Sequence, residues 1–142
     1  MTTIGRLLES KAPEVYGIDP DAPVIDALRL MAEHHIGAVL ALRGGALAGI
    51  VSERDYARKV VLAGRSSRDT AVREIMTEQV TCVGPEATVD QCMRLVTEGR
   101  FRHLPVLQGG AVIGVVSIGD LVKAVIEAQQ QELDHLQRYI AG

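Results

Sequence analysis

Residues 49–55 of the chain read Gly-Ile-Val-Ser-Glu-Arg-Asp, and residues 114–120 read Gly-Val-Val-Ser-Ile-Gly-Asp. Both stretches place a glycine and two apolar residues before a serine, and an aspartate three positions after that serine. This spacing is typical of a helix N-terminus, where the hydroxyl accepts a free backbone N–H and the carboxylate lies favourably in the first turn. Each stretch therefore predicts a strand that leads into a helix at the serine.

The two stretches belong to a tandem repeat with a shift of 65 residues and no gap. The same shift superposes the pair Gly44-Gly45 on Gly109-Gly110. Agreement over this length indicates a duplication, so we expect two copies of one unit in the 142 residues. Further matching positions are Pro20 and Pro85, Val24 and Val89, Arg29 and Arg94, Leu30 and Leu95, Glu33 and Glu98, Leu42 and Leu107, and Val60 and Val125.

Each copy is predicted to form a β-α-β-β-α unit. A short strand at 15–18 or 80–83 precedes a helix with apolar residues at helical spacing, and residues 88–91 (Thr-Val-Asp-Gln) fit a capping box. Because a unit of about 50 residues buries little surface alone, the two copies should pack together in an α/β (α+β) fold. Two apolar runs around each Gly-Gly pair indicate hairpins of residues 38–42 with 46–51 and of 103–107 with 111–116.

The repeat predicts a first copy at 9–63, a linker with a short helix at 64–78, a second copy at 79–128 and a C-terminal helical extension at 129–142. Residues 4–8 are expected to form one more helical turn that covers a face. The apolar residues of the last helix recur at intervals of three, four or seven: Val122, Val125, Ile126, Leu133, Leu136 and Ile140. A homodimer contact and packing back onto the helix's own domain both remain open.

Composition restricts the classes of function. A net charge of −3 argues against a nucleic-acid binder, which normally shows a basic face. No apolar stretch approaches the ~20 residues of a membrane span, and no secretory signal is visible. Two cysteines outside any C-x-x-C arrangement, Cys82 and Cys92, indicate reduced thiols and a cytoplasmic protein. Aromatic residues make up 3% of the chain, so the core should be aliphatic.

The sequence lacks the residues that metal sites and common nucleotide-binding motifs require. The adjacent pair His34-His35 lacks the spacing of helix metal ligands, and no Cys/His cluster suggests zinc. No Gly-Lys-Ser/Thr motif appears, and a strand rather than a helix follows the first Gly-Gly pair. We therefore predict no metal site, no catalytic residues and no enzymatic activity.

Two interpretations of the serine–aspartate junctions stay open. The first is helix capping alone. In the second, the positive potential and free N–H groups of the helix N-terminus attract phosphate, and a carboxylate accepts the paired hydroxyls of a ribose. Phosphate would then contact Ser52 or Ser117 with nearby basic residues, while ribose would contact Asp55 or Asp120.

The duplicated unit with G-h-x-S-x-x-D closing each copy resembles the CBS domain, and the chain resembles a stand-alone CBS-domain pair over roughly residues 4–127. This resemblance implies a pseudo-twofold pair, called a Bateman module. Such a module binds AMP, ADP, ATP, NAD or S-adenosylmethionine in clefts between the repeats. AMP, ATP or NAD(H) are then regulatory ligands rather than catalytic cofactors. The expected partners are a second copy in a homodimer and an unidentified effector protein, without nucleic acid or membrane.

Two alternatives to this sensor remain. One is a structural dimerisation module with vestigial pockets, and the other is an enzyme that acts on a nucleotide.

The copies differ at the first strand of each hairpin. The resemblance implies that residues at the start of this strand face the ligand phosphates. There Arg102 and His103 can supply charge-assisted bonds, whereas Gly37 and Ala38 cannot. A solvated arginine and a histidine beside a buried strand are the alternative interpretations.

The first junction carries more basic residues than the second. Arg54 is a candidate phosphate contact, and Lys59 is either a second one or the i,i+4 ion-pair partner of Asp55. We therefore expect two unequal nucleotide sites.

Adenine should be held by aliphatic side chains and backbone amides, because few rings are present. The candidates are Ile18 and Val83 at the ends of the first strands, with Pro105 opposite them, and ordinary core packing is the alternative for each. Only Phe101, Tyr16 and Tyr56 could contribute a ring near the sites.

Overall fold

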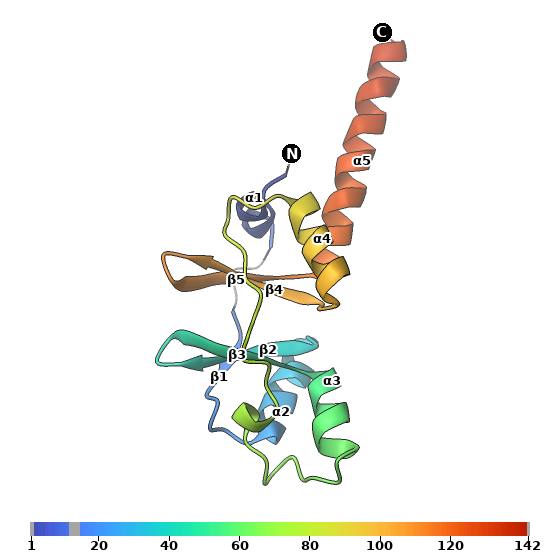
Figure 1. Cartoon of the computed structure of the whole chain (residues 1–142). Helices are drawn as coiled ribbons and strands as arrows, with labels where there is room; N and C mark the ends of the chain where they lie inside the picture. Colours follow the sequence, from blue (N-terminus) through green and yellow to red (C-terminus); the bar gives the residue numbers. More distant parts are fainter. Residues whose placement is uncertain (1, 12–14, 142) are drawn as a thin grey trace. The chain divides into compact units, whose positions relative to one another are not determined.

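The computed structural model describes residues 2–11 and 15–141, which form two compact units (Figure 1). Each unit is named for the repeat whose helices and sheet it holds. The first-repeat unit comprises residues 15–81 and 109–113, and the second-repeat unit comprises residues 2–11, 82–108 and 114–141. The mixed α/β fold class predicted from the sequence is confirmed.

The elements follow one another in the predicted order. They are α1 (Ile4–Glu9), β1 (Gly17–Ile18), α2 (Val24–His34), β2 (Ala38–Arg43), β3 (Ala46–Ser52), α3 (Glu53–Tyr56), the π-helix η1 (Ala57–Val61), the 3₁₀ turn η2 (Val72–Glu74), α4 (Val89–Gly99), β4 (His103–Gln108), β5 (Ala111–Ser117) and α5 (Ile118–Ala141).

The sheet of the first-repeat unit has the order β1-β2-β3. Strand β1 lies parallel to β2, and β2 is antiparallel to β3. The turn between β2 and β3 holds Gly44 at φ +58° and Gly45 at φ +83°. Two successive left-handed residues define the type I′ turn that matches the twist of a hairpin, which explains the glycine pair. The core between the sheet and its helices is aliphatic, with Val24, Ala27, Met31, Val39, Ala41, Val51, Val60, Val72 and Ile75 buried.

In the described residues of the second-repeat unit, β4 and β5 form a two-stranded sheet. The strand predicted at 80–83 is wrong: Val83 makes an isolated parallel bridge with Val106, and no strand is assigned at 80–83. The cause lies in the neighbouring strand. In the first-repeat unit the N–H of Leu40 donates to the carbonyl of Tyr16, whereas the matching position of the second repeat is Pro105, which has no N–H to donate.

The helices begin where the serine and threonine caps predict. Thr88 caps α4 in a full capping box with Gln91, and Ser52 caps α3 in the same way with Asp55. Helix α3 continues directly into the π-helix η1, and its counterpart α5 runs for 24 residues. The last part of α5 extends beyond the other elements of its unit (Figure 1).

A short segment from outside the repeat completes each core. We call residues 2–11 and 70–77 the cover segments; they contain α1 and η2 respectively. In the second-repeat unit the N–H of Ile4 donates to Ala87, and in the first-repeat unit the N–H of Val72 donates to Ala22, at 2.8 and 2.9 Å. Ile4 and Val72 are both 0% exposed. The turn predicted at residues 4–8 is thus confirmed, and it belongs to the core of the second repeat.

The first glycine of each G-h-x-S-x-x-D motif lies directly under a cover segment. A Cβ on Gly49 would stand 2.7 Å from the carbonyl oxygen of Thr77 and 2.8 Å from Sδ of Met76. A Cβ on Gly114 would stand 2.7 Å from Cδ2 of Leu8. Close approach of the cover segment, rather than a turn, is therefore the reason for the glycine in both copies.

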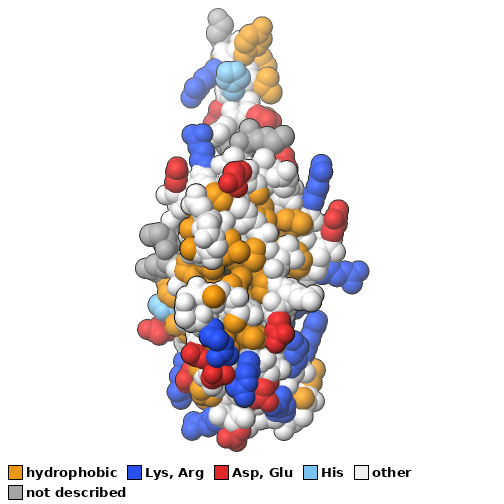
Figure 2. Space-filling view, turned by 60° about the vertical axis from the view of Figure 1, so that its left-hand side comes forward, with side chains coloured by type: hydrophobic (Ala, Val, Ile, Leu, Met, Phe, Trp, Pro, Cys, Tyr) orange, Lys and Arg blue, Asp and Glu red, His pale blue; other side chains and the backbone are white. Residues whose placement is uncertain are grey.

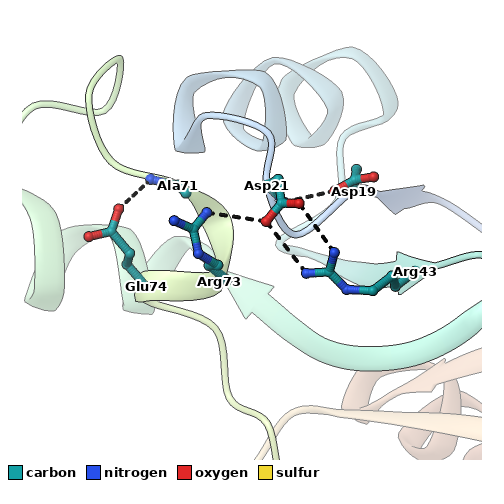
Figure 3. A network of polar contacts seen from close by, with 6 residues as sticks. All are labelled: Asp19, Asp21, Arg43, Ala71, Arg73 and Glu74. Carbon is teal, nitrogen blue, oxygen red and sulfur yellow. Dashed lines mark hydrogen bonds and ion pairs between the residues drawn. The ribbon is translucent and has the colours of Figure 1, made fainter.

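Surface ion pairs attach the cover segment of the first-repeat unit to its neighbours (Figure 3). Asp21 pairs with Arg43 at the end of β2 and with Arg73 in η2, both at 3.2 Å. The hydrogen bonds and positive charge of Arg43, helped by Arg73, hold the pKa of Asp21 below its usual value. The second repeat has Glu86 and Gln108 at the positions of Asp21 and Arg43, so this network is particular to the first.

The glycine contacts predict a graded loss of stability on substitution by alanine. Gly49→Ala should lower the free energy of unfolding by about 1–3 kcal/mol, because its methyl group meets a backbone oxygen that cannot move alone. Gly114→Ala should cost less, since the group it meets is the end of a leucine side chain. Gly37→Ala is the control, with no atom within 4 Å of its Cβ position. Urea unfolding measures all three, and equal losses at Gly49 and Gly37 would contradict the assignment.

Candidate functional site

The first junction lies where β3 ends and α3 begins. The N–H and the hydroxyl of Ser52 both donate to Oδ2 of Asp55, at 2.9 and 3.0 Å, and the N–H of Asp55 donates to the Ser52 hydroxyl oxygen. Lys59, one turn further along, lies 3.1 Å from Oδ1 of Asp55 and donates to the carbonyl of Ile75. The Asp55 side chain is 16% exposed. A half-buried carboxylate, a hydroxyl and an ammonium group thus meet at one helix N-terminus.

The second junction lies where β5 ends and α5 begins. The N–H of Ser117 donates to Oδ2 of Asp120 at 2.9 Å, and the N–H of Asp120 donates to the Ser117 hydroxyl at 3.1 Å. The Nζ of Lys11 donates to the same Oδ2 and to the carbonyl of Val115. Both contacts fall on Oδ2, and within residues 2–11 and 15–141 no group donates to Oδ1 of Asp120.

Each motif aspartate has a lysine partner, but the two lysines come from different parts of the chain. Lys59 is on the helix that the motif itself begins, whereas Lys11 follows α1 in the cover segment. The position that matches Lys59 in the second repeat is Ala124. Sequence reasoning missed Lys11, because the residue 65 positions further on is Met76 and the repeat therefore gives no sign of a conserved basic position there.

Electrostatics at the second junction favours an ionised Asp120 and a neutral His103. Burial raises the pKa of Asp120, but the hydrogen bonds and charge of Lys11, with the hydrogen bonds from Ser117, outweigh burial and hold that pKa below its usual value. Burial also lowers the pKa of His103, and the positive charges of Lys11 and Arg102 lower it further against the opposing effect of Asp120. His103 is therefore a neutral hydrogen-bonding group near pH 7.

The start of the first hairpin strand lies beside the helix N-terminus in both units. The N–H of Glu53 donates to the carbonyl of Gly37 at 3.0 Å, and the N–H of Ile118 donates to the carbonyl of Arg102 at 2.9 Å. The backbone of Arg102 and His103 thus lies beside the second junction, and the phosphate contacts expected of their side chains stay a prediction. The Arg102 side chain is exposed.

The first junction has Arg54 in the first turn of α3, with an exposed side chain. Among the described residues, neither Arg54 nor Arg102 makes a side-chain hydrogen bond or an ion pair. Both guanidinium groups are therefore available to an anion.

The three candidates for the adenine contact lie on the first strands and their neighbours. Ile18 is half-buried and pairs with Ala41 across β1 and β2. Val83 is also half-buried, and its N–H donates to the carbonyl of Pro105, which is buried in β4. Val83 and Pro105 thus lie together. Tyr16, one of the few rings, stacks on His34 with ring centroids 3.9 Å apart.

The structure therefore assembles Ser52, Asp55 and Lys59 in the first-repeat unit, and Ser117, Asp120, Lys11 and His103 in the second-repeat unit. Each set combines acceptors for hydroxyl groups with cationic donors for phosphate, which suits a nucleoside phosphate. In the described part of the chain, no cluster of three or more His, Cys, Asp or Glu is placed to hold a metal ion. Nor is any described helix long and apolar enough to span a bilayer.

Comparison with known families identifies the repeated unit. The CBS domain matches residues 11–62 and 72–127. A mitochondrial CBS domain-containing protein of Arabidopsis thaliana, CBSX3, is 43% identical over 150 residues, which cover 99% of this chain and 73% of that protein. The expected cytoplasmic location therefore gains no support from this relative and stays a prediction.

Solved structures agree with the fold. A putative signal-transduction protein with CBS domains from Burkholderia ambifaria has a TM-score of 0.87 and 53% identity over 90% of this chain and 96% of its own. A hexameric CBS-CP12 protein from bloom-forming cyanobacteria has a TM-score of 0.75 and 26% identity, covering 94% and 81%.

The contacts of Asp120 predict a pH-dependent contribution from Lys11. Because the folded pKa of Asp120 is depressed, its stabilisation is present above the unfolded pKa and is lost as pH falls through the folded value. Lys11→Met should raise the pKa of Asp120 and lower stability at pH 7 by about 0.5–1 kcal/mol, a modest figure because Lys11 is 35% exposed. Carboxyl NMR titration checks this. Lys59→Met is the matched control, and a shift of Asp120 in that variant alone would refute the pairing.

Proposed function

Because the chain belongs to the CBS-domain family, with two CBS domains along its length, we propose that it is a sensor of adenosine nucleotides that signals to a partner protein. CBS-domain proteins are generally regulatory modules that bind adenosine ligands. Stand-alone members are typically regulatory rather than catalytic. The observation that carries the proposal is the recurrence, in both units, of a serine-capped helix start with a half-buried aspartate beside a lysine.

The ribose is proposed to bind at the two aspartates. At the second junction Lys11 and Ser117 occupy only Oδ2 of Asp120, so Oδ1 is available to a ribose hydroxyl. At the first junction the N–H and the hydroxyl of Ser52 both donate to Oδ2 of Asp55, while Lys59 contacts Oδ1, so Oδ1 is the oxygen that keeps a lone pair. Ribose binding there adds a donor to an oxygen that already accepts one.

The phosphates are proposed to reach the basic groups around each junction. Arg54 in one unit and Arg102 in the other are exposed and form charge-assisted hydrogen bonds with a phosphate. The second site also offers His103, which is neutral near pH 7 and therefore contributes a hydrogen bond rather than a charge. Two sites of different charge favour different nucleotides, for example a nucleoside monophosphate in one and a triphosphate in the other.

Adenine is proposed to lie against Ile18 in one unit, and against Val83 and Pro105 in the other. These aliphatic groups are half-buried or buried, and they lie on the strands next to the junctions. Aliphatic walls suit a flat apolar base in a chain with 3% aromatic residues.

A structural module with vestigial pockets is the second candidate. The motif residues already satisfy each other as capping boxes, so they stabilise the helices even without ligand. Thermal shifts with AMP, ADP, ATP and NAD separate the two candidates, because ligand at 100 times its dissociation constant adds about 2.7 kcal/mol of stability. If none of the four compounds changes the melting temperature, the sensor proposal is wrong and the structural module is supported.

Substitution of the aspartates should separate the two sites. Asp120→Asn and Asp55→Asn each keep an amide oxygen for the serine N–H, so the fold is retained, but each removes the charge that accepts ribose hydroxyls. Calorimetric titration with AMP and ATP should show about 10- to 100-fold weaker binding at one site per variant. The control is Asp69→Asn, in an exposed loop.

A comparison of AMP with 2′-deoxy-AMP tests the ribose assignment directly. The wild-type protein should prefer AMP, and the preference should shrink in the aspartate variants. A preference that persists in both variants would place the ribose elsewhere.

A further inference from the structure

The last part of α5 is an exposed helix, and its Gln129 and Leu136 border a groove beside Thr88. Residues 129–141 are all exposed, around the full circumference of the helix, and this end extends beyond α4 and α1 (Figure 1). The open alternative of packing back onto its own domain is therefore not observed for these described residues. Most helical stability in proteins comes from packing of an apolar face, and a partner on this exposed end of α5 would supply such packing.

The exposed apolar side chains of α5 follow a heptad pattern. They are spaced four, seven, three and four residues apart, which corresponds to d and a positions repeated every seven residues with Gln129 at one d position, the period of a coiled coil rather than of a globular helix. The apolar members are Val122, Ile126, Leu133, Leu136 and Ile140, exposed to 40%, 59%, 53%, 55% and 82%. Figure 2 shows hydrophobic side chains gathered along one side of the projecting end.

We propose that this seam, defined as Val122, Ile126, Gln129, Leu133, Leu136 and Ile140, pairs with the same seam of a second copy of the chain in a parallel two-stranded coiled coil. The proposal concerns assembly and does not depend on nucleotide binding. Three heptads of paired seam bury side chains that otherwise remain exposed to water.

The single polar member of the seam argues for a second copy. Gln129 occupies a d position between Ile126 and Leu133. In a parallel, in-register pair it faces Gln129 of the other copy, and the two amides can hydrogen-bond as donor and acceptor. In an antiparallel pair centred on the same heptads it would face Leu133, which leaves both amides unpaired at a cost. A polar seam residue that pairs well only with the same residue of the other copy fixes the register of the two helices.

The flanking charges favour the same orientation. Glu132 occupies a g position of the seam. In the parallel pair it lies next to Gln137 of the other copy, which can donate a hydrogen bond to it. In the antiparallel pair Glu132 would face Glu132, and two like charges would repel. Avoidance of this repulsion therefore favours the parallel dimer.

A charge in the seam should dissociate the dimer. Leu133→Glu should weaken dimerisation about a hundredfold, because it replaces two buried leucines with two facing carboxylates. Gln131→Glu adds the same charge on the outer face and is the matched control. Light scattering after size exclusion and sedimentation equilibrium of the full-length protein measure the mass. A monomeric wild type, or a dimer that Leu133→Glu leaves intact, would overturn the proposal.

A cysteine at the end of the seam tests the orientation. In a Cys82→Ser background, Ile140→Cys should form an intermolecular disulfide on mild oxidation, because the two copies of residue 140 meet in a parallel pair. In an antiparallel pair they would lie about 27 Å apart. Arg138→Cys, on the outer face, should not cross-link. If Leu133→Glu dissociates the dimer but Ile140→Cys does not cross-link it, the parallel arrangement is wrong.

Discussion

Neither repeat can complete its own core, and this constraint determines much of the structure. Each sheet and its helices leave one apolar side open, and a segment from outside the repeat closes it by backbone hydrogen bonds and by buried side chains, among them Ile4 in one unit and Val72 in the other. The cover segment passes so close to the last strand of the hairpin that the strand carries glycine there, at Gly49 and Gly114. The glycine that begins the repeated motif is thus a packing requirement, while its serine and aspartate serve the helix.

The serine–aspartate junction does two tasks with the same atoms. The reciprocal hydrogen bonds of Ser117 and Asp120 begin α5 without any ligand, which makes the motif structural in the first instance. At the second junction Lys11 changes that balance, because its hydrogen bond and charge help to hold the pKa of Asp120 low despite burial. An ionised and preorganised acceptor is what a ribose diol needs. The capping interpretation and the ligand interpretation therefore describe one arrangement rather than two competing ones.

The sequence predicted the fold well wherever periodicity and turn chemistry carried the information. The Gly-Gly turns, the capping residue Thr88 and the helical spacing of the apolar residues all placed their elements correctly. The strand at 80–83 was predicted by analogy and is wrong, because one proline in a neighbouring strand removes a hydrogen-bond donor. The apolar pattern of residues 80–83 contains no information about a hydrogen-bond donor that is missing from the neighbouring strand.

The residues of the candidate site also divide into those that local spacing predicted and those that it did not. Ser52, Asp55 and Lys59 lie within about two turns of helix, at spacings of three and four residues, so their spacing alone brought them together. Ser117 and Asp120 were equally accessible to a motif argument. Lys11 was not, because its contact with Asp120 spans 109 positions of sequence and depends on where the cover segment packs. A contact of this kind depends on how distant segments pack, and a comparison of the two repeats gives no information about it.

The path of the cover segments has a consequence for biosynthesis. The first-repeat unit has the segment that covers it, residues 70–77, soon after its own hairpin and helix have been made. Residues 2–11, by contrast, precede the first repeat, whereas the carbonyls that their N–H groups contact, those of Pro85 and Ala87, lie in the second repeat. Ile4 and Leu7 therefore stay uncovered until the second repeat has been made. One repeat is covered by a segment made directly after it, and the other by a segment made well before it.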